Sequence, residues 1–206
     1  MNLPNKISMV RILMIPVFLV VLLVEIPGIS FVVPVVEVAL YRYIATVIFL
    51  AAAFTDFLDG YIARKRNQVT DLGKFLDPLS DKLLVMAAML YLVGIYPSQL
   101  PSWIVVIILA REFIISGFRT IAARRGIVLA ADVWGKVKTV FQIIMISAIL
   151  VEVPGLDSIL YERFSFGVPV FAAFTWFLIA ATVGLTLISG VLCMVKNAEV
   201  LKEYKK

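Results

Sequence analysis

Four aspartates at helical spacing are the residues of this chain whose types and positions best suit chemistry. Asp56 and Asp59 stand three residues apart, and Asp77 and Asp81 stand four residues apart. Both intervals place a pair on one face of a helix. The intervening stretch 65–76 contains polar and glycine residues that can turn the chain. Two antiparallel helices would then bring the four carboxylates into one pocket.

Four carboxylates in one pocket point to metal-assisted chemistry. Like charges this close disfavour one another unless cations neutralise them. The chain contains no histidine and a single cysteine, Cys193, so an oxygen-only ligand set remains, which Mg²⁺, Mn²⁺ and Ca²⁺ prefer. Two divalent ions bridged by shared carboxylates would balance the four charges, and paired ions of this kind clamp phosphoryl-transfer substrates. The pattern therefore predicts a two-metal site for phosphoryl transfer.

An alternative is that these aspartates pair with neighbouring basic residues in a solvated loop, which fits Asp71. It fits the first pair poorly, because FLAAAFTDFLDGYIA places both members inside an apolar run. Ionisable residues within a membrane span are functional candidates by default. Beside that pair, Gly60 and Ala63 leave room for a ligand, and Arg64, one turn beyond Gly60, can grip a phosphate with two hydrogen bonds.

The elements that must position these residues are predicted to be membrane-spanning helices. The chain of 206 residues is 62% hydrophobic and 16% charged, against about 45–50% apolar and about 25% charged in soluble domains. A spanning helix needs roughly 20 mostly apolar residues. We therefore expect an all-α integral membrane protein, a single domain over 1–206, with six transmembrane helices. The six predicted spans are 8–26, 40–61, 78–96, 101–123, 137–153 and 168–195. The apolar segment 29–39 is short, and we expect it to be an outer re-entrant or interfacial piece.

The distribution of basic residues predicts the orientation. Of 19 lysines and arginines, only Arg42 and Arg163 fall at the ends predicted to be outer, which leaves 17 at the opposite ends. Cytoplasmic loops carry such an excess, so both termini and the aspartates are expected at the cytoplasmic side. The net charge of +5 then needs no nucleic-acid partner. No small-residue cleavage site follows the basic N-terminus, so the first apolar run is expected to be a retained helix.

Residues 56–81 carry a pattern with eight fixed positions, D-x2-D-G-x2-A-R-x8-G-x3-D-x3-D. This pattern resembles the signature of the CDP-alcohol phosphotransferases, membrane enzymes that move a phosphatidyl or similar group from a CDP-linked donor to an alcohol. The resemblance implies a six-helix bundle of that type, commonly a homodimer, with its active site facing the cytoplasm.

The resemblance also implies roles for individual residues. Asp56, Asp59 and Asp77 are expected to bind two divalent ions, Mg²⁺ or Mn²⁺, with Asp81 completing the second metal site and serving as general base. The positions expected to receive the CDP moiety and its diphosphate are Gly60, Ala63, Arg64 and Gly73, with Asn5 near the nucleotide.

A second group of basic residues predicts a pocket for the acceptor. Arg111 lies deep inside an apolar run, and Arg119, eight residues on, can share its helix face. Lys136 and Lys138 begin the fifth predicted span. Topology signalling explains other basic residues of this region but not a charge as deep as Arg111. We expect these four residues to bind an acceptor that itself carries a phosphate.

The stretches MNLPNKISMVRILMIPVF, AREFIISGFR and GKVKT resemble the bacterial branch of the family that uses glycerol 3-phosphate. This resemblance implies transfer from CDP-diacylglycerol to glycerol 3-phosphate, among the lipids of the bacterial cytoplasmic membrane. Inositol phosphate, serine or phosphatidylglycerol remain alternative acceptors. An ion-coupled transporter is the alternative from another class, but transporters often show an internal repeat, and no second aspartate-rich segment is present.

Overall fold

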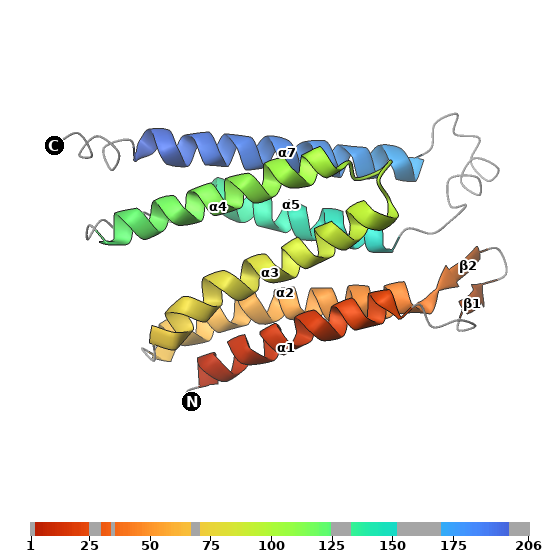
Figure 1. Ribbon diagram of the computed structural model, residues 1–206, viewed down its shortest axis with the longest axis horizontal. Coiled ribbons are helices and arrows are strands. Elements are labelled where there is room, and N and C mark those ends of the chain that lie inside the picture. The colour runs from red at the N-terminus through yellow and green to blue at the C-terminus, as the bar shows by residue number, and fades with distance from the viewer. Residues whose placement is uncertain are drawn as a thin grey trace.

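The computed structural model describes residues 3–24, 30–33, 36–66, 71–124, 133–151 and 170–197, and for 3–8, 30–33, 36–39, 56–66, 71–79, 81 and 124 it describes the backbone alone. Within these ranges the chain forms six helices that lie alongside one another, with a small hairpin at one end (Figure 1). The helices are α1 (Leu3–Leu23), α2 (Leu40–Arg66), α3 (Asp71–Ile95), α4 (Ser102–Arg124), α5 (Val133–Leu150) and α7 (Val170–Lys196).

The predicted bundle of helices is confirmed, because each of the six apolar runs corresponds to one helix. The helices contain 18 to 27 residues, which makes them about 27–40 Å long at 1.5 Å per residue. That length suits a hydrocarbon layer of about 30 Å. Over the described residues, α5 and α7 are long and apolar enough to cross a membrane, and α1, α2 and α3 contain shorter apolar stretches.

The segment between α1 and α2 contains a feature that the sequence did not predict. Strands β1 (Ser30–Val33) and β2 (Val36–Ala39) pair antiparallel, with Ser30 opposite Ala39 and Val33 opposite Val36. The all-α prediction therefore omitted a two-stranded hairpin. Four of the eight strand residues are valines, and β-branched side chains favour extended backbone.

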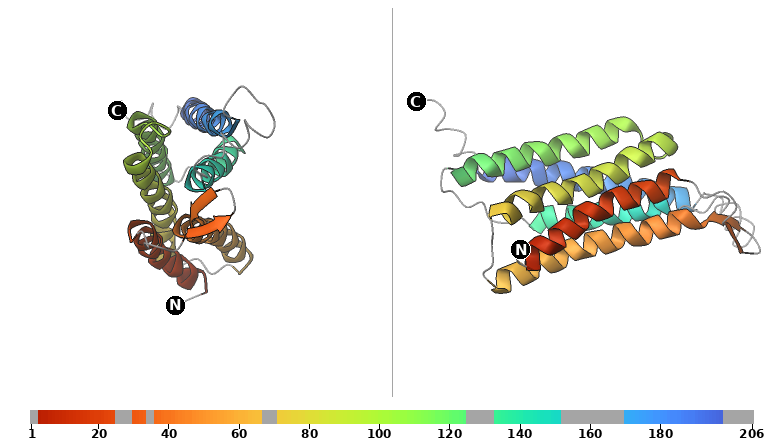
Figure 2. Two further views of the ribbon diagram at one scale, coloured as in Figure 1. Left: turned by 90° about the vertical axis from the view of Figure 1, so that its right-hand side faces the viewer. Right: turned by 60° about the horizontal axis from the view of Figure 1, so that its bottom comes forward.

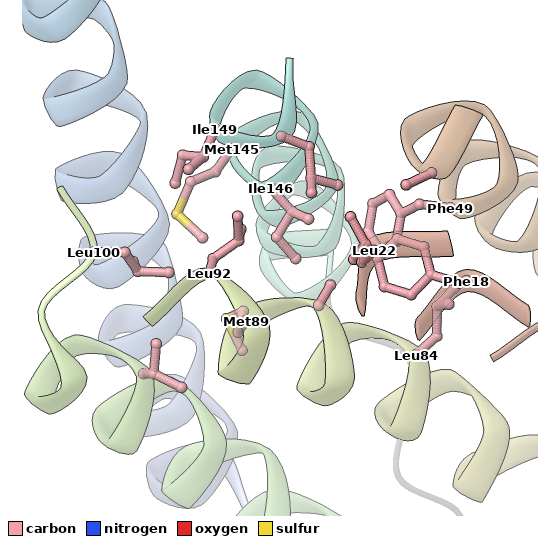
Figure 3. Packing of buried hydrophobic residues seen from close by; sticks show 14 of the residues in the cluster. Phe18, Leu22, Phe49, Leu84, Met89, Leu92, Leu100, Met145, Ile146 and Ile149 are labelled. Atoms are coloured by element: carbon pink, nitrogen blue, oxygen red, sulfur yellow. The ribbon is translucent and has the colours of Figure 1, made fainter. Parts of the chain in front are cut away.

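The bundle is held by a core that runs through most of its helices. α1 packs against α2 and α3, while α5 packs against α7 and α2. Phe18 of α1 meets Phe49 of α2 with ring centroids 5.9 Å apart, and Leu84, Met89 and Ile146 extend the same cluster into α3 and α5 (Figure 3). Large apolar side chains also cover the outside of the bundle, as expected for a surface that meets lipid.

Small and hydroxylated residues form the buried face of α7. Thr175, Thr182, Thr186, Ser189 and Gly190 recur at helical spacing on this face. Such residues let helix backbones approach closely where lipid supplies no hydrophobic drive for association. The Thr186 hydroxyl donates to the Thr182 carbonyl oxygen at 2.6 Å, so its polarity is satisfied inside its own helix.

Candidate active site

The two aspartate pairs occupy matching places on neighbouring helices. Asp56 and Asp59 lie 10 and 7 residues before the end of α2 at Arg66, while Asp77 and Asp81 lie 6 and 10 residues after the start of α3 at Asp71. The end of α2 and the start of α3 lie together at one end of the bundle, where α1 also begins (Figure 1). Antiparallel helices joined in this way bring the two pairs to the same level, about 9–15 Å from the helix ends.

Residues on the same helix faces as the aspartates are buried in the interior of the bundle. Ala52, four residues before Asp56, has no exposed surface. Ser80, three residues after Asp77, is also fully buried, and Leu84, three residues after Asp81, is nearly so. Since residues three or four apart share a helix face, the aspartate positions continue the buried faces of α2 and α3.

The aspartate side chains lie outside the described residues, as do those predicted to bind CDP. Their backbone positions are described: Gly60, Ala63 and Arg64 follow the first pair along α2, Gly73 precedes the second pair in α3, and Asn5 lies in the first turn of α1. Among the side chains that the structure describes, no group of three His, Cys, Asp or Glu residues gathers. The roles assigned to the aspartate segments and to the CDP-binding positions remain predictions.

A buried arginine ties α1 to the aspartate-bearing part of α3. Arg11 is 1% exposed, and its Nη1 donates to the Ser80 hydroxyl oxygen at 3.2 Å. Ser80 directly precedes Asp81. The sequence interpretation counted Arg11 only as a topology signal. Arg11 lies inside the first predicted span, three residues after its start, and that place within an apolar run was the signal that could have identified it.

A cavity of about 120 Å³ opens beside these residues, where five helices meet. Its apolar wall includes Ala52 and Ala53 of α2, the latter three residues before Asp56. The polar lining residues come from α1, α3, α4 and α5, and are Arg11, Lys82, Glu112, Lys138, Thr139 and Gln142. Among the described lining side chains, three cations therefore face one carboxylate, and the cavity suits an anion.

One glutamate organises the cationic side of this cavity. The Glu112 carboxylate forms an ion pair with the Lys138 ammonium and lies 3.6 Å from Nη1 of Arg111. Arg111 Nη2 in turn donates to the Ser189 hydroxyl oxygen of α7 at 2.6 Å. A Cβ at Gly190 would lie 3.2 Å from Cγ of Arg111, so the glycine leaves room for this side chain. The network links α4, α5 and α7.

The four residues predicted to bind the acceptor phosphate do not gather at one place. Lys138 lines the cavity and is buried. Arg111 contacts the same carboxylate as Lys138, that of Glu112. Arg119 and Lys136 are exposed and are not among the residues that line this cavity. Sequence reasoning gave no role to Glu112 or Lys82, although Glu112 stood next to Arg111 in the same apolar run.

Comparisons with known proteins agree with the motif. A family model described as CDP-alcohol phosphatidyltransferase matches residues 1–188. The CDP-diacylglycerol–glycerol-3-phosphate 3-phosphatidyltransferase of Bacillus subtilis is 40% identical over 201 residues, which are 98% of this chain and 97% of the relative. The enzyme of that name from Haemophilus influenzae is 37% identical, covering 72% of this chain and 75% of its own. A probable phosphatidylglycerophosphate synthase of Mycobacterium tuberculosis is 34% identical, covering 75% of this chain and 68% of its own.

Proposed function

Because the chain belongs to the CDP-alcohol phosphatidyltransferase family, we propose that it transfers the phosphatidyl group of CDP-diacylglycerol to glycerol 3-phosphate. The products are phosphatidylglycerophosphate and CMP. The observation that supports this choice of acceptor best is the cationic cavity at the aspartate level, since it suits a substrate that brings a second phosphate. The names and coverage of the relatives support the same acceptor.

The proposed setting is the bacterial cytoplasmic membrane, with all six helices spanning it and both termini in the cytoplasm. The lengths of the helices and the apolar outer surface of the bundle support this placement. α1 begins and α7 ends at the same end of the bundle (Figure 2), as two termini on one side of a membrane require. Most of the lysines and arginines were predicted to lie at this end, which the positive-inside rule assigns to the cytoplasm. A homodimer is proposed from the family resemblance.

The aspartate positions fit a pair of divalent cations, Mg²⁺ or Mn²⁺. Asp56, Asp59, Asp77 and Asp81 offer an oxygen-only donor set from two helices at one level, which is the chemistry that these ions prefer. When bound, the two ions would supply charge neutralisation at the donor's diphosphate. Gly60, Ala63 and Gly73 would leave space for the CDP moiety, with Arg64 on its phosphates and Asn5 near the nucleotide.

The chain's own residues then position and deprotonate the acceptor. In the proposed reaction the acceptor hydroxyl oxygen bonds to the phosphatidyl phosphorus, and the bond from that phosphorus to the CMP oxygen breaks. CMP leaves with the electron pair, and Asp81 accepts the hydroxyl proton. An aspartate has an ordinary pKa of about 3.9, so it takes this proton as the attacking oxygen loses electron density in the transition state. Positioning and charge stabilisation supply most of the acceleration.

The acceptor's phosphate is assigned to the side of the cavity that Glu112 organises. Lys138 would contact the phosphate directly, and Arg111 would contact it from beside the shared carboxylate. Arg119 and Lys136, predicted for the same role, are exposed and lie outside the lining of this cavity. Opposite charges in a water-poor cavity attract strongly, which suits the capture of a small dianion from the cytoplasm.

The test uses purified protein in detergent with CDP-diacylglycerol, Mg²⁺ and a panel of acceptors, read by CMP release and product mass. We expect phosphatidylglycerophosphate from glycerol 3-phosphate and loss of activity after chelation. A preference for serine, inositol phosphate or phosphatidylglycerol would overturn the acceptor and keep the reaction type. Absence of CMP release with every acceptor, or full activity in excess chelator, would overturn the proposed reaction itself.

A further inference from the structure

A long apolar groove lies along the seam between α1 and α3. At one level of this seam, Arg11 donates to the Ser80 hydroxyl oxygen at 3.2 Å. At a second level, the Tyr91 hydroxyl donates to the Leu22 carbonyl oxygen at 3.3 Å. Both bonds join residues 69 positions apart, so α1 and α3 run parallel in one register. The lining of this α1–α3 groove includes Ile12, Pro16, Leu19, Leu83, Ala87 and Tyr91.

The lining of the α1–α3 groove suits a hydrocarbon chain. Its described lining residues include no lysine, arginine, aspartate or glutamate, and the hydroxyl of Tyr91 is engaged by a backbone carbonyl. Leu23 and Leu90, which also line the groove, are 69% and 53% exposed, so it opens on the outside of the bundle. Pro16 favours this opening, because a proline inside a helix gives no N–H to the Ile12 carbonyl oxygen and bends the helix there.

One end of the groove adjoins the candidate active site. Ile12 directly follows Arg11, and Leu83 comes two residues after Asp81. α1 lines the groove from Ile12 to Leu23, a distance of about 16 Å along the helix axis. One leaflet of a bilayer has a hydrocarbon layer about 15 Å deep, half of the whole core. The groove therefore begins beside the predicted reaction centre and has the length of a lipid chain in one leaflet.

The width of the groove selects the kind of occupant. Its volume is about 700 Å³, which gives a mean cross-section of about 45 Å² over that length. A helix with its side chains is about 10–12 Å across and has a cross-section of roughly 80–110 Å². The groove is therefore too narrow to seat a helix of a second copy of this chain, and it suits a slender flexible chain.

We propose that the α1–α3 groove holds an acyl chain of the phosphatidyl donor while the donor's diphosphate lies at the aspartates. The inference rests on the proposed function, in which one molecule joins a charged group at the site to chains that stay in lipid. Lipid chains are as apolar as the groove, so moving a chain into it from the bilayer releases little free energy. The groove contributes position instead, because a chain held beside the site aligns the phosphorus atom for attack.

The first measurement locates the chain without turnover. CDP-diacylglycerol with a photoactivatable diazirine in one acyl chain is irradiated with the detergent-solubilised protein and Mg²⁺, without acceptor, and labelled peptides are mapped by mass. We expect label on the groove-lining residues of α1 and α3, and we expect excess unlabelled CDP-diacylglycerol to remove it. Phosphatidylcholine with the same diazirine is the control, and it should label the outer surface without concentrating in the groove.

The second measurement fills the groove. Ala87→Phe places a ring in its lining, and donors with chains of different lengths are compared. Because a misplacement of about 1 Å at a reacting centre costs up to about 100-fold, kcat/KM for a dioleoyl donor should fall about 10- to 100-fold. A dihexanoyl donor, whose chains are too short to pass Ala87, and the KM for glycerol 3-phosphate should change little. Ala180→Phe is the matched control at an exposed alanine of α7 outside the groove, and it should behave as the wild type with every donor.

A substitution at the far end tests the length of the groove. In the wild type, kcat/KM should rise with chain length until the groove is filled and then level off. Leu23→Trp enlarges an exposed side chain, so it blocks the far end without disturbing the core. We expect the levelling-off in this variant to move to shorter chains, with dihexanoyl activity retained.

Unchanged chain-length profiles in both A87F and L23W would overturn the proposal. Equal labelling of the groove by both lipids, or label spread evenly over the outer surface, would do the same, as would a loss in Ala180→Phe equal to that in A87F. If A87F does not fold, L23W decides by the same profile. Label confined to the groove and displaced by CDP-diacylglycerol, without product from any acceptor, would refute the proposed function and leave the groove standing. Normal product with evenly spread label would refute the groove alone.

Discussion

Replacing Glu112 by glutamine isolates the ion pair that holds α4 to α5. The substitution keeps the shape of the side chain and removes the charge that faces the Lys138 ammonium. The Lys138 side chain is 3% exposed and that of Glu112 is 19% exposed. Breaking a buried pair from one side costs about 3–5 kcal/mol. Because Glu112 retains some contact with water and borders a cavity, we expect about 2–3 kcal/mol.

The partner substitution completes a double-mutant cycle. Lys138→Met removes the ammonium and keeps most of the side-chain volume, so the double variant carries neither charge. Replacing both members of a buried pair by uncharged groups is often close to neutral. We therefore expect E112Q with K138M to be at least about 1 kcal/mol more stable than the sum of the two single changes predicts.

The assay is thermal unfolding in a fixed detergent without substrate. For a chain of this length about 1 kcal/mol corresponds to roughly 2–4 °C in Tm, so E112Q should unfold about 4–12 °C below the wild type. Lys136→Met is the control: it removes an exposed lysine two residues away and should change stability by no more than about 0.5 kcal/mol. Additive effects of E112Q and K138M, within about 0.3 kcal/mol, would refute the idea that this pair fixes the two helices.

Three further predictions address other parts of the molecule. Gly190→Ala places a methyl group within 3.2 Å of the Arg111 side chain and should raise the KM for glycerol 3-phosphate several-fold with little change in Tm; an unchanged KM would separate Arg111 from the acceptor. Asp81→Asn should reduce turnover at least about 100-fold, as loss of a general base does, while Asp71→Asn keeps wild-type turnover; comparable losses in both would contradict their different assignments. Phe49→Ala removes a fully buried ring and should cost about 3 kcal/mol in unfolding experiments; a loss under about 1 kcal/mol would mean that the core closes around the gap.

The sequence predicted the helices well because their cause is local. Runs of about 20 apolar residues are long enough to cross a membrane, and each corresponds to a helix. The predicted ends of the spans differ from the observed helix ends where the apolar run stops before the helical hydrogen bonding does. The second run was predicted to end at 61, but α2 continues to Arg66 through charged residues that a helix tolerates in water. The hairpin was missed because a short valine-rich segment fits several structures equally well.

Only the parts of the site that depend on short intervals along the chain could be predicted from the sequence. The aspartate pairs are encoded by intervals of three and four residues, and the helices that carry them place them at one level. The contact of Arg11 with Ser80 joins residues 69 positions apart, and no local pattern encodes such a contact. The role of Glu112 depends likewise on Lys138 in another helix. From sequence alone, a basic residue near a span is interpreted as a topology signal, and only the structure shows whether its side chain is buried.

The hydrogen bond from Arg111 to Ser189 joins α4 to a helix that is synthesised much later. α7 is the last helix of the bundle in chain order, and it contributes none of the described residues that line the cavity. The family match also ends at residue 188, just before the serine and glycine that receive Arg111. A nascent chain that has not yet formed α7 already carries all four aspartates of the candidate metal site but lacks the hydroxyl that accepts a hydrogen bond from Arg111. We expect the acceptor site to become competent only when α7 has packed against α4, so that unfinished chains do not consume substrate.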